Sequence, residues 1–260
     1  MIKLTIDGQV IEVEEELSVL EAAREMGIEI PTLCYHEALT PYGACRVCTV
    51  EIIKKGWSRL STACTYPVQE GIEVKTNSEK VRKARKLILE LLLARCPNVK
   101  PIQDLAKKIG VKKTRFQVDN EECILCGLCV RVCQELVGVS AIGFVNRGTE
   151  RQVTTPYQIR SDVCIGCGAC ATVCPTGAIK IEDDQNLRKI PLWHTELKRK
   201  KCKMCSNFFV PEVEIDFLKT KDLHLPQDLF EICPDCRRSE LGNKLSRFKT
   251  TIPGNFLTKI

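Results

Sequence analysis

Two runs of four cysteines restrict the possible folds of this chain more than any other feature of its sequence. The runs share the spacing C-x2-C-x2-C-x3-C and comprise Cys123, Cys126, Cys129 and Cys133, then Cys164, Cys167, Cys170 and Cys174. Three thiolates from one tight loop can bind three irons of a [4Fe-4S] cubane, and a distant cysteine completes the fourth corner. The repeated spacing therefore predicts two [4Fe-4S] clusters.

Two such loops in a pseudo-twofold relation exchange their fourth ligands. The predicted ligands of the first cluster are Cys123, Cys126, Cys129 and Cys174, and those of the second are Cys164, Cys167, Cys170 and Cys133. The alternative, a pair of zinc knuckles or a cysteine-rich core, explains the pattern poorly because knuckles usually present two CxxC pairs. Gln134, not proline, follows Cys133, and thirty residues separate Cys133 from Cys164. This departure indicates an insertion between the loops without loss of a ligand.

An irregular group of four cysteines lies upstream, with one CxxC pair and two isolated members. These cysteines are Cys34, Cys45, Cys48 and Cys64. Two pairs of thiolates can hold the two irons of a [2Fe-2S] cluster, and the small residues Gly43 and Ala44 let backbone amides approach sulfide. A four-cysteine zinc site is the alternative, but the irregular spacing weakens it. We therefore expect one [2Fe-2S] cluster here.

The segments around this group carry the signals of a small β-grasp sheet with one helix. Apolar residues that alternate on both sides of a turn at Asp7 predict a hairpin over residues 1–14. Ser18 and Glu21 form a capping-box pattern, which predicts a helix that begins directly after Ser18. Further strands are predicted over residues 48–53 and 72–75.

Composition restricts the location of the protein and the kinds of partner that it can have. Seventeen cysteines, an odd number, and an N-terminus without signal-peptide features predict a reducing, cytoplasmic location. The longest nearly apolar run, residues 87–94, is too short to cross a bilayer. A net charge of +6 favours acidic partner surfaces, whereas an aromatic content of 5% argues against a nucleic-acid platform. We expect neither a membrane span nor a nucleic-acid partner.

At this point the sequence resembles a known family. The segments IPTLCYHEALTPYGACRVCTVEI and STACTYPVQEGIEV, followed by the two-cluster run, resemble the N-terminal part of the iron–sulfur subunits of respiratory complex I. They are equally similar to the diaphorase iron–sulfur subunit of NAD-linked hydrogenases, and to parts of electron-bifurcating hydrogenases and NAD-dependent formate dehydrogenases. The resemblance covers about residues 1–182. It implies that the chain conducts electrons between a flavin- and NAD-binding subunit and a second active site.

The sequence departs from this family after a helix predicted over residues 78–94. Cys96-Pro97 stands where much of the family has His-Pro, and residues 98–116 contain no cysteine or histidine. One thiolate cannot hold a cubane, so we expect the family's third cluster to be absent and Cys96 to be a half-buried free thiol. A short helix and linker over residues 101–113 would join the two cluster domains.

The tail contains two further CxxC pairs, which the resemblance does not reach. They are Cys202 and Cys205, then Cys233 and Cys236. Paired knuckles are typical of a structural zinc ribbon, while a rubredoxin-like iron or another iron–sulfur centre would use the same ligands. The basic run at residues 198–201 is interpreted as a solvated turn, and His194 and His224 as surface or packing residues.

These patterns predict an α+β chain of four parts. The parts are a β-grasp [2Fe-2S] ferredoxin domain (1–78), a helical linker (79–118), a two-[4Fe-4S] ferredoxin domain (119–185) and a zinc-ribbon-like tail (186–260). Within the third part we expect an inserted hairpin over residues 138–157 and a closing strand over residues 178–181.

The sequence shows no dinucleotide fingerprint, no Walker A loop and no Ser-His-Asp pattern, so the cofactors carry the chemistry. We expect an electron-transfer subunit, without an active site of its own, that links a flavin/NAD(H)-binding partner to a hydrogenase catalytic subunit. Electron bifurcation with soluble ferredoxin is an open extension. One alternative is the same role in an NAD-dependent formate dehydrogenase. An alternative of another class is a redox-sensing cluster protein with a nucleic-acid-binding zinc ribbon.

Overall fold

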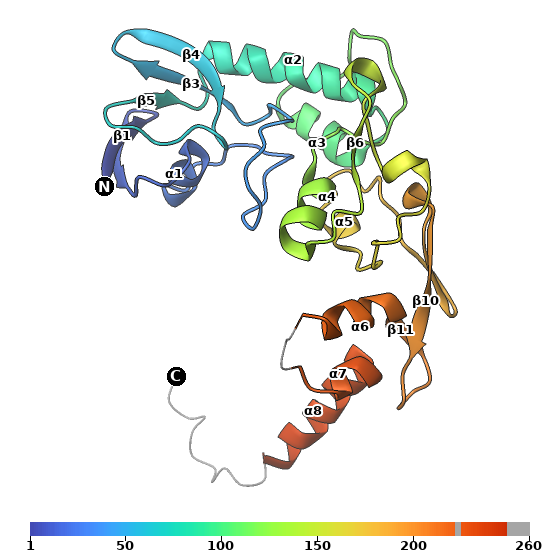
Figure 1. Ribbon diagram of the computed structural model, residues 1–260. Coiled ribbons are helices and arrows are strands. Elements are labelled where there is room, and N and C mark those ends of the chain that lie inside the picture. Colours follow the sequence, from blue (N-terminus) through green and yellow to red (C-terminus); the bar gives the residue numbers. More distant parts are fainter. Residues whose placement is uncertain (222–224, 249–260) are drawn as a thin grey trace. The chain divides into compact units, whose positions relative to one another are not determined.

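The computed structural model describes residues 1–221 and 225–248, which divide into two compact units (Figure 1). The first unit contains Met1–Gln158 and Ala169–Lys180. The second contains Ile159–Gly168 and the chain from Ile181 onward. The segment with the second cysteine run contributes to both units, and the boundaries of the four predicted parts remain predictions.

The first unit begins with a five-stranded sheet of order β2-β1-β5-β3-β4. Its strands are β1 (Ile2–Ile6), β2 (Gln9–Val13), β3 (Thr49–Lys54), β4 (Trp57–Thr62) and β5 (Glu73–Lys75). β1 pairs in parallel with β5, and the other neighbours are antiparallel. The predicted hairpin and strands are present. β4 was not predicted because most of this edge strand is exposed and its sequence lacks an apolar alternation.

The helix α1 (Val19–Glu25) packs its apolar side into the core of this sheet, which includes Leu4 and Val50. The predicted capping box is confirmed: the Glu21 amide donates to the Ser18 hydroxyl at 3.3 Å, and the Ser18 amide donates to the Glu21 carboxylate at 2.7 Å. The Tyr35 hydroxyl also donates to Glu21, at 2.9 Å. The start of α1 is therefore tied to the residue that follows Cys34.

A second core lies beside α2 (Glu79–Arg95) and α3 (Lys100–Lys108), which confirm the two predicted helices. Leu89 and Ile102 from these helices are fully buried in this core. The core also includes apolar residues of the cysteine loops, so the linker helices pack directly against the cluster-binding segments. No described helix is long and apolar enough to cross a membrane.

The remainder of the first unit is built from short elements. These are α4 (Leu128–Arg131), η1 (Val132–Val137), β6 (Gly143–Val145), η2 (Gly148–Glu150), β7 (Gln152–Thr154), η3 (Pro156–Gln158) and α5 (Ala169–Thr172). The antiparallel β6–β7 pair confirms the predicted hairpin. The predicted closing strand over 178–181 is wrong, because the backbone amides of Ala178 and Ile179 point to the Cys174 sulfur instead of to a neighbouring strand.

The second unit is a four-stranded antiparallel sheet, of order β11-β10-β9-β8, with short helices. Its elements are β8 (Glu182–Asp184), β9 (Leu187–Ile190), η4 (Pro191–Trp193), β10 (Thr195–Lys201), β11 (Phe208–Pro211), α6 (Glu212–Lys219), α7 (Asp228–Glu231) and α8 (Pro234–Phe248). The buried side chain of Trp193 lies before β10. His194 is exposed, as expected, and His224 lies outside the described residues.

The basic run at residues 198–201 is not the solvated turn that we expected. It forms the second half of β10, where Thr195 and Leu197 are buried and the residue between them is exposed. The Arg199 guanidinium donates to the Phe208 carbonyl at 2.9 Å and lies 3.3 Å from the Asp183 carboxylate. These contacts place Arg199 within the sheet rather than in solvent.

Replacement of the cap residue, Ser18→Ala, is expected to loosen α1 alone. Loss of an N-cap side chain costs about 1 kcal/mol, which corresponds to roughly fivefold faster exchange of amides that open locally. Hydrogen exchange of the peptide 19–25, measured by mass spectrometry, checks this. Ser78→Ala is the matched control, since Ser78 caps α2 by accepting from the Val81 amide at 3.3 Å. Equal acceleration of both helices by either variant would contradict the assignment.

Candidate cluster and metal sites

The four cysteines predicted to bind a [2Fe-2S] cluster come together in the first unit. Cys34, Cys45, Cys48 and Cys64 are all buried. The Cys48 and Cys64 sulfurs lie 3.3 Å apart, and the Cys45 amide donates to the Cys34 sulfur at 3.4 Å. Buried thiols arranged in this way fit a small cluster whose two irons each take two thiolates.

The electrostatics of this group favour a metal-binding thiolate. Hydrogen bonds from the Cys45 and Cys64 thiols lower the pKa of the Cys34 thiol to about 2. The same hydrogen bonds raise the pKa of Cys45 and of Cys64, which donate them. Metals bind the deprotonated sulfur, so a loop that already stabilises one thiolate is suited to ligation.

Gly43 is required by the shape of this loop. Its φ angle of +70° lies in the left-handed region, and a Cβ atom placed there would lie 3.1 Å from the Thr65 methyl group. Only glycine meets both conditions without strain. The backbone at this position therefore lies close against the Thr65 side chain, next to Cys64.

The predicted ligands of the first [4Fe-4S] cluster all lie in the first unit. Cys126 and Cys129 are buried, and the Leu125 amide donates to the Cys123 sulfur at 3.4 Å. Burial raises the pKa of Cys126 to about 11, with further contributions from the Cys123 and Cys174 thiols. Cys174 thus acts electrostatically on the loop that precedes it by many residues. This proximity agrees with the exchanged fourth ligand.

Cys174 has an environment that stabilises its thiolate. Burial raises the pKa of this thiol, but a hydrogen bond with the Thr176 hydroxyl, at 3.4 Å, and the amides of Ala178 and Ile179 outweigh it and lower the pKa overall. Amide and hydroxyl donors aimed at sulfur also help set the reduction potential of an iron–sulfur centre.

The predicted ligands of the second [4Fe-4S] cluster are divided between the units. Cys133 and Cys170 belong to the first unit, and Cys164 and Cys167 belong to the second. The Ala141 amide donates to the Cys133 sulfur at 3.3 Å. The assignment of these four ligands therefore stays a prediction from the spacing and from the exchange of fourth ligands.

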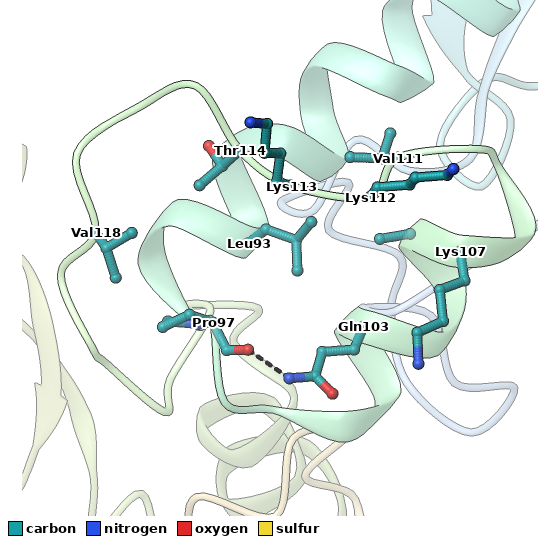
Figure 2. A pocket seen from close by; sticks show the side chains of 10 residues that line it. Leu93, Pro97, Gln103, Lys107, Val111, Lys112, Lys113, Thr114 and Val118 are labelled. Atoms are coloured by element: carbon teal, nitrogen blue, oxygen red, sulfur yellow. Dashed lines mark hydrogen bonds between the residues drawn. The ribbon is translucent and has the colours of Figure 1, made fainter.

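Cys96, which stands in place of a family ligand, is fully buried rather than half-buried as we expected. It follows α2, whose apolar side encloses it in the second core. Burial raises the pKa of Cys96 to about 12, so the thiol stays protonated. The next residue, Pro97, lines a pocket of about 530 Å³. Figure 2 shows the lining side chains, which include three lysines, Gln103 and Thr114 beside apolar residues but no cysteine or histidine.

The tail cysteines form a compact tetrad in the second unit. The sulfurs of Cys202, Cys205, Cys233 and Cys236 all lie within 4.8 Å of one another. Those of Cys205 and Cys233 are 3.7 Å apart. Four thiolates at about 2.3 Å from one tetrahedral ion are separated from one another by about 3.8 Å. The spacing fits a single metal ion better than a cubane, whose ligands surround four irons.

Backbone amides prepare this tetrad for a metal. The Cys233 amide donates to the Cys202 sulfur at 3.2 Å, and the Cys236 amide donates to the Cys233 sulfur at 3.5 Å. Amide donors from Cys205 and Cys233 lower the pKa of the Cys202 thiol to about 6. At neutral pH this group therefore presents a thiolate.

The predicted [2Fe-2S] ligands lie where the two cores of the first unit meet. Cys48 and Cys64 belong to the sheet core, whereas Cys34 and Cys45 belong to the second core, together with Cys126 of the first [4Fe-4S] loop. Buried apolar packing is thus continuous from one cluster loop to the next.

Sequence reasoning missed two arginines near these loops. Arg85 of α2 and Arg131 of α4 are buried, and each donates to backbone carbonyl groups of the [2Fe-2S] segment. The sequence gives no direct signal for them, because charged residues on helices are usually exposed.

Comparison with protein families identifies two domain types. A 2Fe-2S iron–sulfur cluster binding domain matches residues 1–79, and a 4Fe-4S dicluster domain matches residues 122–178 and 163–207. The chain therefore contains tandem domains for [2Fe-2S] and [4Fe-4S] clusters. The second dicluster match reaches Cys202 and Cys205, which keeps an iron centre among the possible occupants of the tail.

Similar proteins belong to oxidoreductase complexes. The chain is 39% identical over 180 residues to the alpha chain of the NADPH-Fe(3+) oxidoreductase of Geobacter sulfurreducens, with 60% of this chain and 21% of that protein covered. It is 38% identical over 181 residues to a component of the NADH-quinone oxidoreductase of Rhizobium meliloti, with 59% and 21% covered. The chain thus spans about a fifth of the length of the curated relatives it matches.

A solved structure extends this relation. A chain of the NAD+-reducing [NiFe]-hydrogenase in the H2-reduced state aligns with a TM-score of 0.53 at 30% identity, covering 59% of this chain and 74% of that chain. The chain belongs to the family of diaphorase- and complex I-like iron–sulfur subunits, and the resemblance in its motifs is confirmed.

The substitution Cys233→Ser is expected to remove the tail metal and to leave the ferredoxin clusters in place, because the tetrad needs all four thiolates to complete a tetrahedral site. Zinc and iron content per chain, measured on anaerobically purified protein, checks this. Cys96→Ser is the matched control, a buried cysteine outside every predicted ligand set, and it should keep both metals at wild-type levels. Retention of the tail metal by Cys233→Ser would contradict the assignment.

Proposed function

We propose that this chain is the electron-transfer subunit of a multisubunit, NAD-linked oxidoreductase. It passes electrons between a flavin/NAD(H)-binding partner and a hydrogenase catalytic subunit. When bound, its clusters supply one-electron transfer, which connects two centres whose hydride and hydrogen chemistry moves electrons in pairs. The chain itself holds the [2Fe-2S] cluster and the first [4Fe-4S] cluster within one compact unit and provides the donors that set their potentials.

The observation that supports this most directly is the continuous buried core around two successive cluster loops. This core includes Cys34 and Cys45 of one loop and Cys126 of the next. Polar contacts join the same loops: the Arg131 guanidinium donates to the Cys34 carbonyl at 2.8 Å, and the Thr40 amide donates to the Glu135 carboxylate at 2.8 Å. A rigid connection of this kind suits an electron conduit, in which the distance between centres must not vary.

The proposed cluster ligands follow the sequence assignment. The [2Fe-2S] cluster is bound by Cys34, Cys45, Cys48 and Cys64, the first [4Fe-4S] cluster by Cys123, Cys126, Cys129 and Cys174, and the second by Cys164, Cys167, Cys170 and Cys133. Close sulfur pairs and amide donors support the first set, and electrostatic coupling of Cys174 to Cys123 and Cys126 supports the second.

We assign zinc to the tail tetrad. The separation of 3.7 Å between the Cys205 and Cys233 sulfurs is that of a tetrahedral thiolate site, and zinc is the usual occupant of two paired CxxC knuckles. Mononuclear iron would fit the same geometry, and metal analysis separates the two ions.

A hydrogenase subunit is favoured as the catalytic partner because the aligned chain comes from an NAD+-reducing [NiFe]-hydrogenase and is matched over 74% of its length. A formate dehydrogenase would make the same use of this chain. Soluble ferredoxin would be a further partner if the complex bifurcates electrons. We place the complex in the cytoplasm, as the odd number of cysteines predicts.

Purification of the tagged chain from its native host under anaerobic conditions tests the proposed function. We expect a flavoprotein subunit, FMN and nickel to accompany the iron of this chain. Molybdenum or tungsten in place of nickel would assign the formate dehydrogenase alternative. Recovery of the chain alone, with iron and zinc but without flavin, would contradict the conduit function and favour a redox-sensing role.

Removal of one [2Fe-2S] ligand, Cys64→Ala, tests the ligand assignment. We expect the EPR spectrum of the reduced [2Fe-2S] cluster to disappear, with a loss of about two iron atoms per chain, while the [4Fe-4S] signals remain. Cys96→Ala is the control and should leave every signal unchanged. A full [2Fe-2S] spectrum in Cys64→Ala would show that this cysteine is not a ligand.

A further inference from the structure

Two buried arginines lie against the segments that carry the proposed [2Fe-2S] ligands. Arg85 is 8% exposed and Arg131 is 9% exposed. The Arg85 Nε atom donates to the Thr49 carbonyl at 3.1 Å, one residue after Cys48. Arg131 donates through Nη2 to the carbonyl of Cys34 itself, at 2.8 Å, and through Nη1 to the Thr40 carbonyl.

Neither guanidinium has a carboxylate partner. Within the described parts of the chain, residues 1–221 and 225–248, no acidic oxygen lies within 4.0 Å of Arg85 or Arg131. The Nη2 atom of Arg85 and the Nε atom of Arg131 are buried without a hydrogen-bond partner. Both side chains therefore keep positive charge and donor capacity that carboxylates do not satisfy.

The nearby acidic residues have other contacts. Asp7 acts weakly on Arg85, but its carboxylate accepts the Thr76 amide at 2.8 Å. Glu135, four residues after Arg131, accepts the Thr40 amide at 2.8 Å. The ring of Tyr42 lies 5.7 Å from the Arg131 guanidinium carbon and offers only a cation–π contact.

An unpaired charge in the interior is costly, and a guanidinium does not lose its proton to avoid that cost. The remaining source of negative charge is cysteine sulfur. Burial lowers the pKa of the Arg85 guanidinium. Of the nearby charges that raise this pKa, the Cys48 thiolate has the largest effect. Arg131 bonds the backbone of Cys34 and lies two residues after Cys129.

We propose that Arg85 and Arg131 are the counter-charges of the cluster sites and that they raise the reduction potential of the [2Fe-2S] centre. Arg131, which follows Cys129 in the first [4Fe-4S] loop, raises the potential of that centre as well. Arg85 acts on the [2Fe-2S] centre alone. This inference rests on the proposed function, because it requires the clusters to be bound by the ligands assigned above.

The physical reason is the change of charge on reduction. A thiolate-bound cluster is negative, and it gains one further unit of negative charge when it accepts one electron from an external reductant. A fixed positive charge in a low-dielectric core stabilises the more negative state more strongly, so the reduced form is favoured. Arginine suits this position because its charge persists at every working pH.

The experiment measures midpoint potentials in the full-length chain by EPR-monitored titration with mediators and dithionite. At each position the charge is removed by glutamine, which can keep one hydrogen bond to a carbonyl, or retained by lysine. The variants are Arg85→Gln, Arg85→Lys, Arg131→Gln and Arg131→Lys. Arg82→Gln is the control for α2, because Arg82 is exposed one turn before Arg85. Arg147→Gln is an exposed control in the same unit as Arg131.

Each glutamine variant is expected to lower the reduced-to-oxidised ratio of the [2Fe-2S] centre at least tenfold at a fixed solution potential. For a one-electron couple this corresponds to a negative shift of about 59 mV. The lysine variants should stay near wild type, and the exposed controls should not move. Arg131→Gln should also shift the first [4Fe-4S] centre, which Arg85→Gln should leave unchanged.

An unchanged midpoint in loaded glutamine variants, or equal shifts in the glutamine and lysine variants, would overturn the inference. If the glutamine variants fail to load clusters while the lysine variants load fully, a requirement for positive charge is supported. If neither the glutamine nor the lysine variants load clusters, the sites require the shape of the arginine side chain and not its charge. That result would also overturn the inference. Absence of a [2Fe-2S] signal from the wild-type chain would instead reject the proposed function.

Discussion

Cysteine sulfur concentrated in an apolar interior is the constraint on which the first unit depends. The four thiols of the predicted [2Fe-2S] group are buried, and so are Cys126 and Cys129 of the next cysteine loop. Negative charge on these sulfurs needs compensation in a low-dielectric environment. The chain supplies it with backbone amides, such as those of Cys45 and Leu125, and with the guanidinium groups of two helices. The short elements and sharp turns of this unit follow from the need to aim these donors.

Much of this arrangement could be predicted from the sequence, because ligand spacing and local capping are short-range properties. The cysteine intervals predicted the cluster types, and the family comparisons confirm both domains. The Ser18 and Glu21 pair predicted the start of α1, and the Asp7-Gly8 pair predicted the turn of the first hairpin, where both residues have positive φ angles. In each case the residues that form the feature lie within a few positions of one another.

The wrong predictions concern residues whose structure is determined by contacts with residues far away in the sequence. The strand expected over residues 178–181 is absent because amides in that segment bond the Cys174 sulfur. The basic run near Arg199 lies in a strand because Asp183 and the Phe208 carbonyl engage its guanidinium. Cys96 is fully buried because the second core, built from both cluster loops and the linker helices, encloses it. Sequence patterns carry no information on such long-range contacts.

The division of the proposed [2Fe-2S] ligands between the two hydrophobic cores has a consequence for the stability of the protein without iron. Cys48 and Cys64 come from the sheet core, and Cys34 and Cys45 from the core of the linker helices. A chain without iron keeps the packing and the hydrogen bonds between these halves, such as the bond from Arg85 of α2 to the Thr49 carbonyl of β3, but it lacks the metal bonds that would link the four sulfurs. Iron binding therefore adds to the stability of the folded first unit, and in a cell that lacks iron the contact between its two cores would open to proteases more often.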